Sequence, residues 1–346
     1  MNNKSNPYNT YLGWWLLILT LMVYLIILIG GLTRLTESGL SMVDWRPLLG
    51  IIPPISEQDW YNVFEEYKKT PEYLIVNNNM EVNQFKYIFW WEYFHRFFAR
   101  LIGFVFLIPF IYFLFKNYLT KKIILQLIVV FVFGCIQAVV GWWMVKSGLN
   151  ENPYVSQYRL SFHLLNAIII LSVLLWMTLS QFVESKNNFI NFKKLKLLVF
   201  ASLLLCLLTI ISGSFVAGTD AGKSFNTFPL MNGKFIPEGY IIYENFIINF
   251  FENTIAIQFN HRWLAVFSFF YIVIIFLIAL QKKLTRLENF FCYAVIFFVT
   301  SQIIIGILTL INNSPILYAS IHQANAILLY CSILTTFFLF SKRNLR

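Results

Sequence analysis

Residues 11–33 read YLGWWLLILTLMVYLIILIGGLT, a run of 23 residues without a charged side chain. An α-helix needs about 20 apolar residues to cross the roughly 30 Å hydrocarbon core of a bilayer. The run is therefore long enough to span a membrane. It lacks a small-residue cleavage site, so it predicts a retained membrane anchor rather than a signal peptide that is removed.

The composition extends this prediction to the whole chain. Of 346 residues, 58% are apolar and only 12% are charged, and the mean hydropathy is +0.67. A soluble domain carries roughly a quarter charged residues, so a cytosolic enzyme or soluble binding module is excluded. Uncharged runs of this length favour helices over barrel strands, and we expect an all-α integral membrane protein. Its eight transmembrane helices are predicted at about 11–33, 89–115, 123–145, 160–182, 197–217, 256–281, 289–311 and 315–341.

The charges predict how the chain is oriented. The N-terminus and alternate connections hold 14 Lys and Arg but two acids, whereas the other connections hold nine Lys and Arg and 13 of the 16 acids. By the positive-inside rule both termini are cytoplasmic, and the long connections 34–88 and 218–255 face outward. With no organelle transit pattern, we expect a multi-pass protein of the bacterial cytoplasmic (inner) membrane. The net charge of +10 follows from this bias, and no nucleic-acid partner is expected.

Two halves of the chain repeat each other. WEYFHR at 91–96 corresponds to IQFNHR at 257–262, QAVVG at 137–141 to QIIIG at 302–306, and HLLNA at 163–167 to HQANA at 322–326. The matches keep their order, and both copies begin on the same side of the membrane, which indicates a parallel repeat. We therefore expect two tandem, pseudo-symmetric four-helix bundles, residues 1–190 and 191–346.

Each predicted bundle contributes one pair of histidines. All four histidines of the chain lie near the start of an even-numbered span and hence in the outer half of the membrane: His95, His163, His261 and His322. A polar residue near an interface, satisfied by a carbonyl or water, is the simpler interpretation of any one of them. Ionisable residues inside membranes are usually functional, and two facing imidazoles are the ligand set of a bis-histidine haem, whereas zinc and copper normally recruit further ligands. We expect each pair to hold a haem without a covalent attachment, with close approach of the ring possible at Gly103, Gly134, Gly141 and Gly306.

The pattern around the histidines is not symmetric. Glu92, three residues before His95, corresponds to Gln258 in the second copy. A carboxylate in a partly desolvated pocket is costly unless it is paired or used; Arg96 and Arg100 are within reach for an ion pair, and an acid–base or charge-stabilising role is the other interpretation. Arg96 and Arg262, each directly after a histidine, are suited to haem propionates, or they extend to the membrane surface.

At this point the sequence resembles a known family. GGLTRLTESGLS at 30–41, Trp45-Arg46-Pro47 and Glu92-x-x-His95-Arg96 are similar to the haem A synthase family, in particular its mitochondrial and alphaproteobacterial branch. The similarity covers essentially the whole chain. One departure is that some members carry a cysteine pair in the first outer connection, and segment 34–88 has no cysteine, so thiol chemistry proposed for those members cannot be transferred.

The resemblance implies an oxidoreductase that converts the C8 methyl group of haem O to a formyl by two successive hydroxylations, giving haem A. It implies that His261 and His322 ligate a resident haem b, with Arg262 as a further contact. His95 and His163, with Arg96 and Arg100, bind the iron and periphery of the haem O substrate, and Glu92 is the catalytic carboxylate. It also implies a partner that supplies haem O, the protoporphyrin farnesyltransferase. The electron donor or acceptor and any homo-oligomer stay open.

Two other functions fit parts of the pattern. A non-catalytic dihaem b-type electron-transfer cytochrome would use the same histidines, although it would not need the difference between Glu92 and Gln258. A haem transporter or chaperone is compatible with a repeat architecture, although it would not need both histidine pairs on one side of the membrane.

Overall fold

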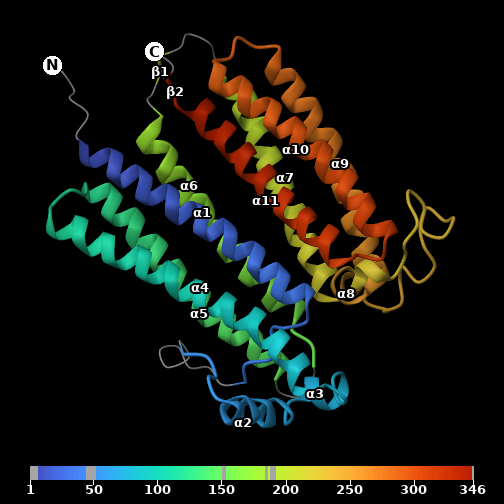
Figure 1. The fold of residues 1–346 in the computed structure, drawn as a ribbon. Helices are drawn as coiled ribbons and strands as arrows, with labels where there is room; N and C mark the ends of the chain where they lie inside the picture. The colour runs from blue at the N-terminus through green and yellow to red at the C-terminus, as the bar shows by residue number, and fades with distance from the viewer. Residues whose placement is uncertain (1–6, 44–51, 150–152, 184–185, 188–191, 345–346) are drawn as a thin grey trace. The chain divides into compact units, whose positions relative to one another are not determined.

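The computed structural model describes residues 7–43, 52–149, 153–183, 186–187 and 192–344 (Figure 1). Within these residues, eight helices are long and apolar enough to cross a membrane. The chain is thus an all-α membrane protein, as its composition predicts. The eight helices are α1 (Pro7–Leu35), α4 (Val82–Phe115), α5 (Lys121–Gly148), α6 (Gln157–Phe182), α7 (Lys193–Gly218), α9 (Thr254–Leu280), α10 (Arg286–Ile311) and α11 (Ile316–Ser341).

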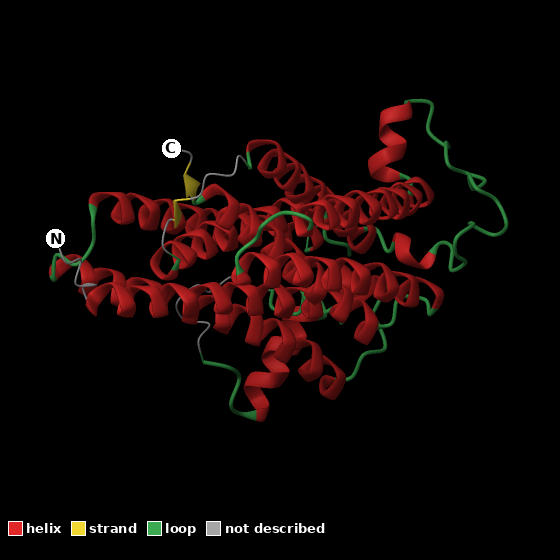
Figure 2. Cartoon of the chain, turned by 90° about the horizontal axis from the view of Figure 1, so that it is seen from above, coloured by secondary structure: helices red, strands yellow, loops and turns green. Residues whose placement is uncertain are grey.

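Shorter elements occupy the connections, and Figure 2 shows how little of the described chain is strand. Two two-residue strands, β1 (Lys186–Asn187) and β2 (Arg343–Asn344), pair in parallel. The remaining elements lie in the two long segments predicted to face outward. They are α2 (Glu57–Tyr67), α3 (Pro71–Ile75), the 3₁₀-helix η2 (Ala221–Lys223) and α8 (Phe246–Glu252).

The described chain divides into two compact units, Ile18–Leu171 and Met1–Leu17 together with Ser172–Arg346. The predicted division at residue 190 and the pseudo-symmetry of the two bundles stay predictions.

In the unit that contains Ser172–Arg346, four long helices form a closed ring. Helix α7 packs against α9 and α11, and α10 packs against the same two helices. Large apolar side chains of these helices are fully buried in the unit, including Phe276 of α9 and Phe338 of α11. A ring of this kind gives every helix two neighbours and leaves one apolar face of each helix for lipid.

In the unit Ile18–Leu171, contacts link successive long helices. Gly30 of α1 faces His95 of α4, and the rings of Phe106 and Phe131 stack between α4 and α5 with their centroids 6.2 Å apart. Gln137 of α5 contacts α6, as described below. The part of α6 that carries His163 is therefore connected to α4 through α5.

The first outer segment is folded onto the start of α4. Trp60, Phe64 and Tyr67 of α2 form a buried aromatic cluster with Phe85 and Phe89 of α4. The rings of Trp60 and Phe89 meet edge to face at 5.0 Å, a favoured aromatic geometry. This cluster explains why α4 begins at Val82, seven residues before the predicted span.

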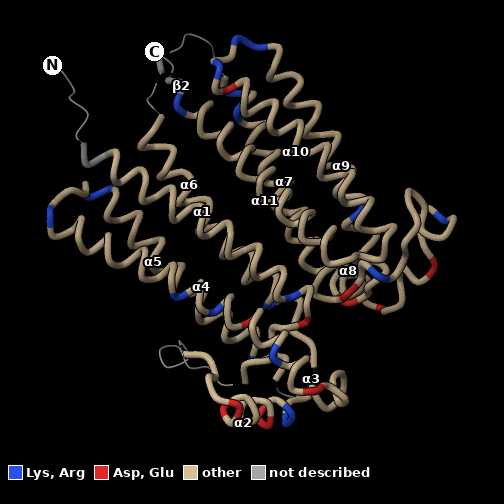
Figure 3. The backbone as a smooth tube through the Cα atoms, viewed as in Figure 1, with Lys and Arg blue, Asp and Glu red and all other residues tan. Residues whose placement is uncertain are grey.

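The charges are distributed unevenly along each unit (Figure 3). Acidic residues gather on α2 and α3 and in the segment around α8. The charged residues in the connection between α4 and α5 and at the start of α5 are all basic, namely Lys116, Lys121 and Lys122. The separation agrees with the charge bias read from the sequence.

Candidate functional site

Each histidine faces a glycine on the long helix that precedes it. A Cβ atom added to the glycine would lie 2.8–3.2 Å from an atom of the imidazole ring. Such contacts are shorter than side chains normally make, so any larger residue would push the ring away. The pairs are Gly30 (α1) with His95 (α4), Gly141 (α5) with His163 (α6), Gly213 (α7) with His261 (α9), and Gly306 (α10) with His322 (α11).

This pattern refines the prediction about glycines. Gly141 and Gly306 each face the imidazole of a histidine, whereas close approach of a haem ring to these glycines stays a prediction. Around Gly103 and Gly134, nothing described lies within 4 Å of an added Cβ. Gly30 and Gly213 were not predicted, although each lies six residues before a further pair of similar segments, TESG at 36–39 and TDAG at 219–222.

The histidines of each half lie near each other. His95 and His163 are close enough for a charge on one to be felt by the other, and the same holds for His261 and His322. All four side chains keep partial exposure inside their helix bundles. Each pair therefore presents imidazole surface that the packing does not cover.

A glutamine–asparagine relay supports one histidine of each pair. In the first half, the Gln137 amide nitrogen lies 3.2 Å from Nε2 of His163, and Asn166 donates to Oε1 of Gln137 at 2.6 Å. Asn166 also donates to the carbonyl of Phe133 at 3.0 Å. The amide group of Gln137 is thereby held against the imidazole by a second amide, which is itself anchored to the backbone.

The second half repeats this relay. The Gln302 amide nitrogen lies 3.2 Å from both ring nitrogens of His322. Asn325 donates to Oε1 of Gln302 at 2.7 Å and to the carbonyl of Phe298 at 2.9 Å. The repeat alignment marks these four amides as equivalent, but only the structure assigns them to the histidines.

The remaining histidines differ in their partners. Ser212 of α7 lies with its Oγ 2.7 Å from Nδ1 of His261. The equivalent position before Gly30 is Ile29, whose side chain has no polar atom. Ile29 therefore cannot give His95 the hydrogen bond that Ser212 gives His261.

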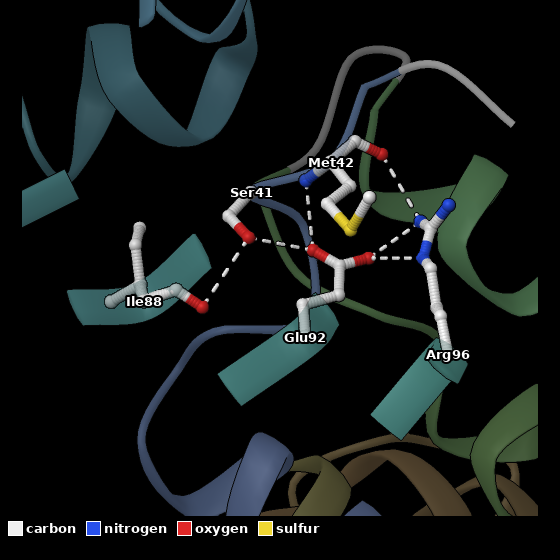
Figure 4. A network of polar contacts seen from close by, with 5 residues as sticks. All are labelled: Ser41, Met42, Ile88, Glu92 and Arg96. Carbon is white, nitrogen blue, oxygen red and sulfur yellow. Dashed lines mark hydrogen bonds and ion pairs between the residues drawn. The ribbon is translucent and has the colours of Figure 1, made fainter. Parts of the chain in front are cut away.

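Glu92 lies at the centre of a network of hydrogen-bond donors (Figure 4). Its Oε2 accepts from the hydroxyl of Ser41 at 2.7 Å and from the backbone N–H of Met42 at 2.8 Å. Its Oε1 accepts from Nε and Nη2 of Arg96 at 3.0 and 2.5 Å. Arg96 also donates to the carbonyl of Met42 at 3.1 Å. The ion pair considered from the sequence is therefore present, and it ties α4 to the start of the outer segment.

Gln258 has the opposite surroundings. Its amide nitrogen donates to the carbonyls of Gly222 and Phe225 at 3.2 and 3.1 Å. Arg262 donates to the carbonyls of Thr227 and Phe225 at 2.7 and 2.5 Å. Glutamate is thus surrounded by donors and glutamine by acceptors. The exchange of Glu92 for Gln258 between the halves is accompanied by a change in everything each one touches.

Three buried polar atoms of the second half have no hydrogen-bond partner among the described residues: Oε1 of Gln258, Nδ2 of Asn260 and Nε of Arg262. In the first half, Nδ1 of His163 is likewise without one in the described part of the chain. Unpaired buried polar atoms are rare in proteins and call for an explanation such as a ligand.

Other predicted residues are placed as follows. Arg100 lies one turn beyond Arg96 on α4. All four cysteines lie in the described part of the chain and are free. Trp45-Arg46-Pro47 of the family motif lies outside the described residues. Among the described residues, no group of three or more His, Cys, Asp or Glu is arranged to hold a metal ion.

Comparison with known proteins adds to this geometry. Residues 13–334 match the COX15-CtaA family, described as cytochrome oxidase assembly protein. The chain belongs to this family. It is 42% identical to the "Heme A synthase" of Nitrosospira multiformis over 92% of this chain and 90% of the relative. It is 40% identical to the "Heme A synthase" of Maricaulis maris over 96% and 95% of the two chains. The "Heme A synthase" of Wolbachia pipientis wMel is 39% identical over 92% and 90%.

Proposed function

We propose that the chain acts as a haem A synthase, an oxidoreductase that oxidises the C8 methyl group of haem O to a formyl through two successive hydroxylations. Relatives of that name match more than nine-tenths of the chain at about 40% identity. The single observation that carries the assignment of sites is a glycine-backed histidine pair in each half, with a carboxylate beside only the first pair.

The second half is the proposed site of a resident haem b. His261 and His322 would ligate its iron, and Arg262 would contact a propionate. Three features fit this group: the glycines that leave room behind each imidazole, the two-imidazole donor set, and the unpaired Nε of Arg262. When bound, haem b supplies a one-electron redox centre.

The first half is the proposed substrate site. His95 and His163 would hold the iron of haem O, while Arg96 and Arg100 bind at its periphery. Gln137 and Asn166 would keep the His163 ring in place. These side chains would thereby position the substrate's methyl group, and positioning of this kind contributes substantially to catalysis.

Glu92 is the proposed catalytic carboxylate. All four of its hydrogen bonds are accepted from donors, so a proton arriving on Glu92 would have to displace one of them. The arrangement therefore favours stabilisation of positive charge that develops as the methyl group is oxidised. Arg96 anchors Glu92 through these hydrogen bonds, and Arg96 is therefore less free to contact a propionate.

The proposed orientation places both termini in the cytoplasm of a bacterium and the histidine pairs toward the outer side of the inner membrane. The separation of acidic and basic connections supports it. We expect haem O to arrive from the farnesyltransferase that makes it.

The test is to extract haems from detergent-purified protein made in a host that supplies haem O, and to separate them by reversed-phase chromatography with mass detection. We expect haem b together with haem O, its hydroxymethyl derivative or haem A. His261→Ala should lose haem b, and His95→Ala should lose the farnesylated haems while keeping haem b. Haem b alone in the wild type would overturn the proposal and favour the electron-transfer cytochrome.

A further inference from the structure

The hydrogen bonds of Ser212 determine which nitrogen of His261 carries a proton. The Ser212 hydroxyl donates its single hydrogen to the carbonyl of Thr209 at 2.8 Å. Its oxygen lies 2.7 Å from Nδ1 of His261. Because that hydrogen is already used, the serine oxygen must accept from Nδ1–H. The neutral imidazole then keeps its lone pair on Nε2, the nitrogen left for a metal.

This contact has an effect known from other metal sites. A ligating histidine commonly donates its second N–H to an oxygen, which fixes the tautomer, orients the ring and raises the basicity of the ligating nitrogen. Ser212 directly precedes Gly213, whose missing Cβ lets His261 approach α7. The two residues together form a backing for the ring, with Gly213 giving space and Ser212 giving an acceptor.

The first half has the space without the acceptor. Gly30 approaches His95 as Gly213 approaches His261, but the residue before it is Ile29. Isoleucine cannot accept a hydrogen bond. The glutamine–asparagine relay is present in both halves, so Ser212 and Ile29 distinguish the two sites at the one histidine that lacks a relay.

We propose that Ser212 is a positioning residue that makes the second half a site of haem retention, whereas Ile29 leaves His95 a weaker ligand from which product can leave. The inference rests on the proposed function, in which His261 ligates a resident haem b and His95 binds a haem that must be released. A resident cofactor has to stay bound through many turnovers. A product bound equally tightly would block the site and prevent the next turnover.

The experiment measures how fast haem leaves the protein. The His95→Ala protein, in which the second site dominates, is the parent, and it is purified alone and with Ser212→Ala or Ser212→Thr added, from a host that makes haem b but not haem O. Transfer of haem to excess apomyoglobin gives the release rate, and a potentiometric titration gives the midpoint potential. Ser214→Ala is the matched control, because Ser214 is buried on the same helix and its hydroxyl donates to the carbonyl of Ile211.

We expect Ser212→Ala to release haem b about 10–100-fold faster, the range found when such outer partners are removed, and to raise the midpoint potential. Ser212→Thr, which keeps the oxygen, should restore both values, and Ser214→Ala should change neither. In the otherwise native chain loaded with haem O, Ile29→Ser should slow release from the first site. Unchanged release in Ser212→Ala, or equal acceleration in Ser214→Ala, would overturn the role of Ser212.

The controls separate this inference from the function on which it rests. Haem b content that does not fall in His261→Ala would refute the proposed haem b site and this inference with it. A haem that depends on His261 but is released at the wild-type rate from Ser212→Ala would refute the inference alone. Unaltered release from Ile29→Ser would refute the proposed contrast between the two halves.

Discussion

Replacing Glu92 with glutamine exchanges a residue for its counterpart in the other half, yet we expect it to destabilise the outer segment. The surroundings of Glu92 are donors, namely the Ser41 hydroxyl, the Met42 N–H and the Arg96 guanidinium. Glutamine suits acceptors, as Gln258 does. The NH₂ group of the new glutamine must therefore face a hydrogen-bond donor instead of an acceptor.

The better of the two amide orientations sets the magnitude. With its oxygen toward Arg96, the amide places its NH₂ against Ser41 and Met42. The Ser41 hydroxyl can rotate, since the carbonyl of Ile88 lies 3.5 Å away as another acceptor. The Met42 N–H cannot, and an unsatisfied buried donor costs about 1–3 kcal/mol. Loss of the charge opposite Arg96 weakens its hydrogen bonds by about 1 kcal/mol more, so we expect a total of about 2–4 kcal/mol.

Hydrogen exchange measures this change where it occurs. We expect the amides of residues 38–43 to exchange faster in Glu92→Gln, by up to about 30–1,000-fold if the whole cost falls on local opening, since each 1.4 kcal/mol is tenfold. Ser41→Ala, which removes one donor together with its bond, should have a smaller effect. Gln258→Glu should loosen residues 219–227, because a carboxylate would face the carbonyls of Gly222 and Phe225.

Exchange at residues 38–43 that matches the wild type would refute this reasoning. The result also decides how activity data are interpreted. If the segment loosens, a loss of haem A production in Glu92→Gln reflects both the lost hydrogen bonds to residues 41 and 42 and any lost role in the reaction. That variant alone then does not assign a proton-transfer role to Glu92.

Two further predictions test other parts of the structure. Gly306→Ala would place a Cβ 2.8 Å from Cε1 of His322 and should lower the haem b content severalfold. Gly134→Ala on α5, where nothing described lies within 4 Å of an added Cβ, should leave the haem b content unchanged. Equal haem content in both variants would contradict the role of Gly306. The pKa of the Glu72 carboxyl is raised to about 8, chiefly by burial and also by the nearby charges of Glu92 and Glu37, and the hydrogen bond from Tyr67 and the charge of Arg34 only partly offset this increase. Because the folded state then binds more protons than the unfolded state, whose carboxyl has a pKa of 4.5, stability should fall between pH 4.5 and 8 by up to about 1.4 kcal/mol per pH unit. Thermal unfolding of Glu72→Gln should lack this part of the pH dependence, and an identical slope in the variant would contradict it.

The transmembrane helices could be predicted from the sequence because each is long and almost free of charge. The start of α4 could not be predicted in this way, because Asn83, Gln84 and Lys86 make its first two turns too polar to be recognised by hydropathy. Local signals were present nevertheless. Glu81 and Gln84 form a reciprocal cap at the start of α4, and Thr70 followed by Pro71 begins α3, a common arrangement at helix N-termini.

The candidate site shows a similar division. The histidines and Glu92 stand out because ionisable residues are rare in apolar helices. Ser212 and Gly30 do not, because serine and glycine are ordinary in membrane helices. Their importance depends on how far each helix is rotated about its own axis, and a single sequence does not encode that rotation directly. Gly213 could have been found by aligning TESG at 36–39 with TDAG at 219–222, because Gly30 and Gly213 each lie six residues upstream of these segments.

The differences between the halves all point in one direction. Both halves keep the glycine behind each histidine and the amide relay to the second histidine of each pair, the features on which the proposed haem sites rest. The first half alone adds a carboxylate with a set of donors around it, and the second half alone adds an acceptor behind its first histidine. If the second copy had only lost its carboxylate, Gln258 would still be surrounded by hydrogen-bond donors, as Glu92 is. Instead, Gln258 donates to the carbonyls of Gly222 and Phe225. Because the exchange of Glu92 for Gln258 is accompanied by altered neighbours, the copies are better explained as specialised for reaction and for retention than as one active and one decayed site.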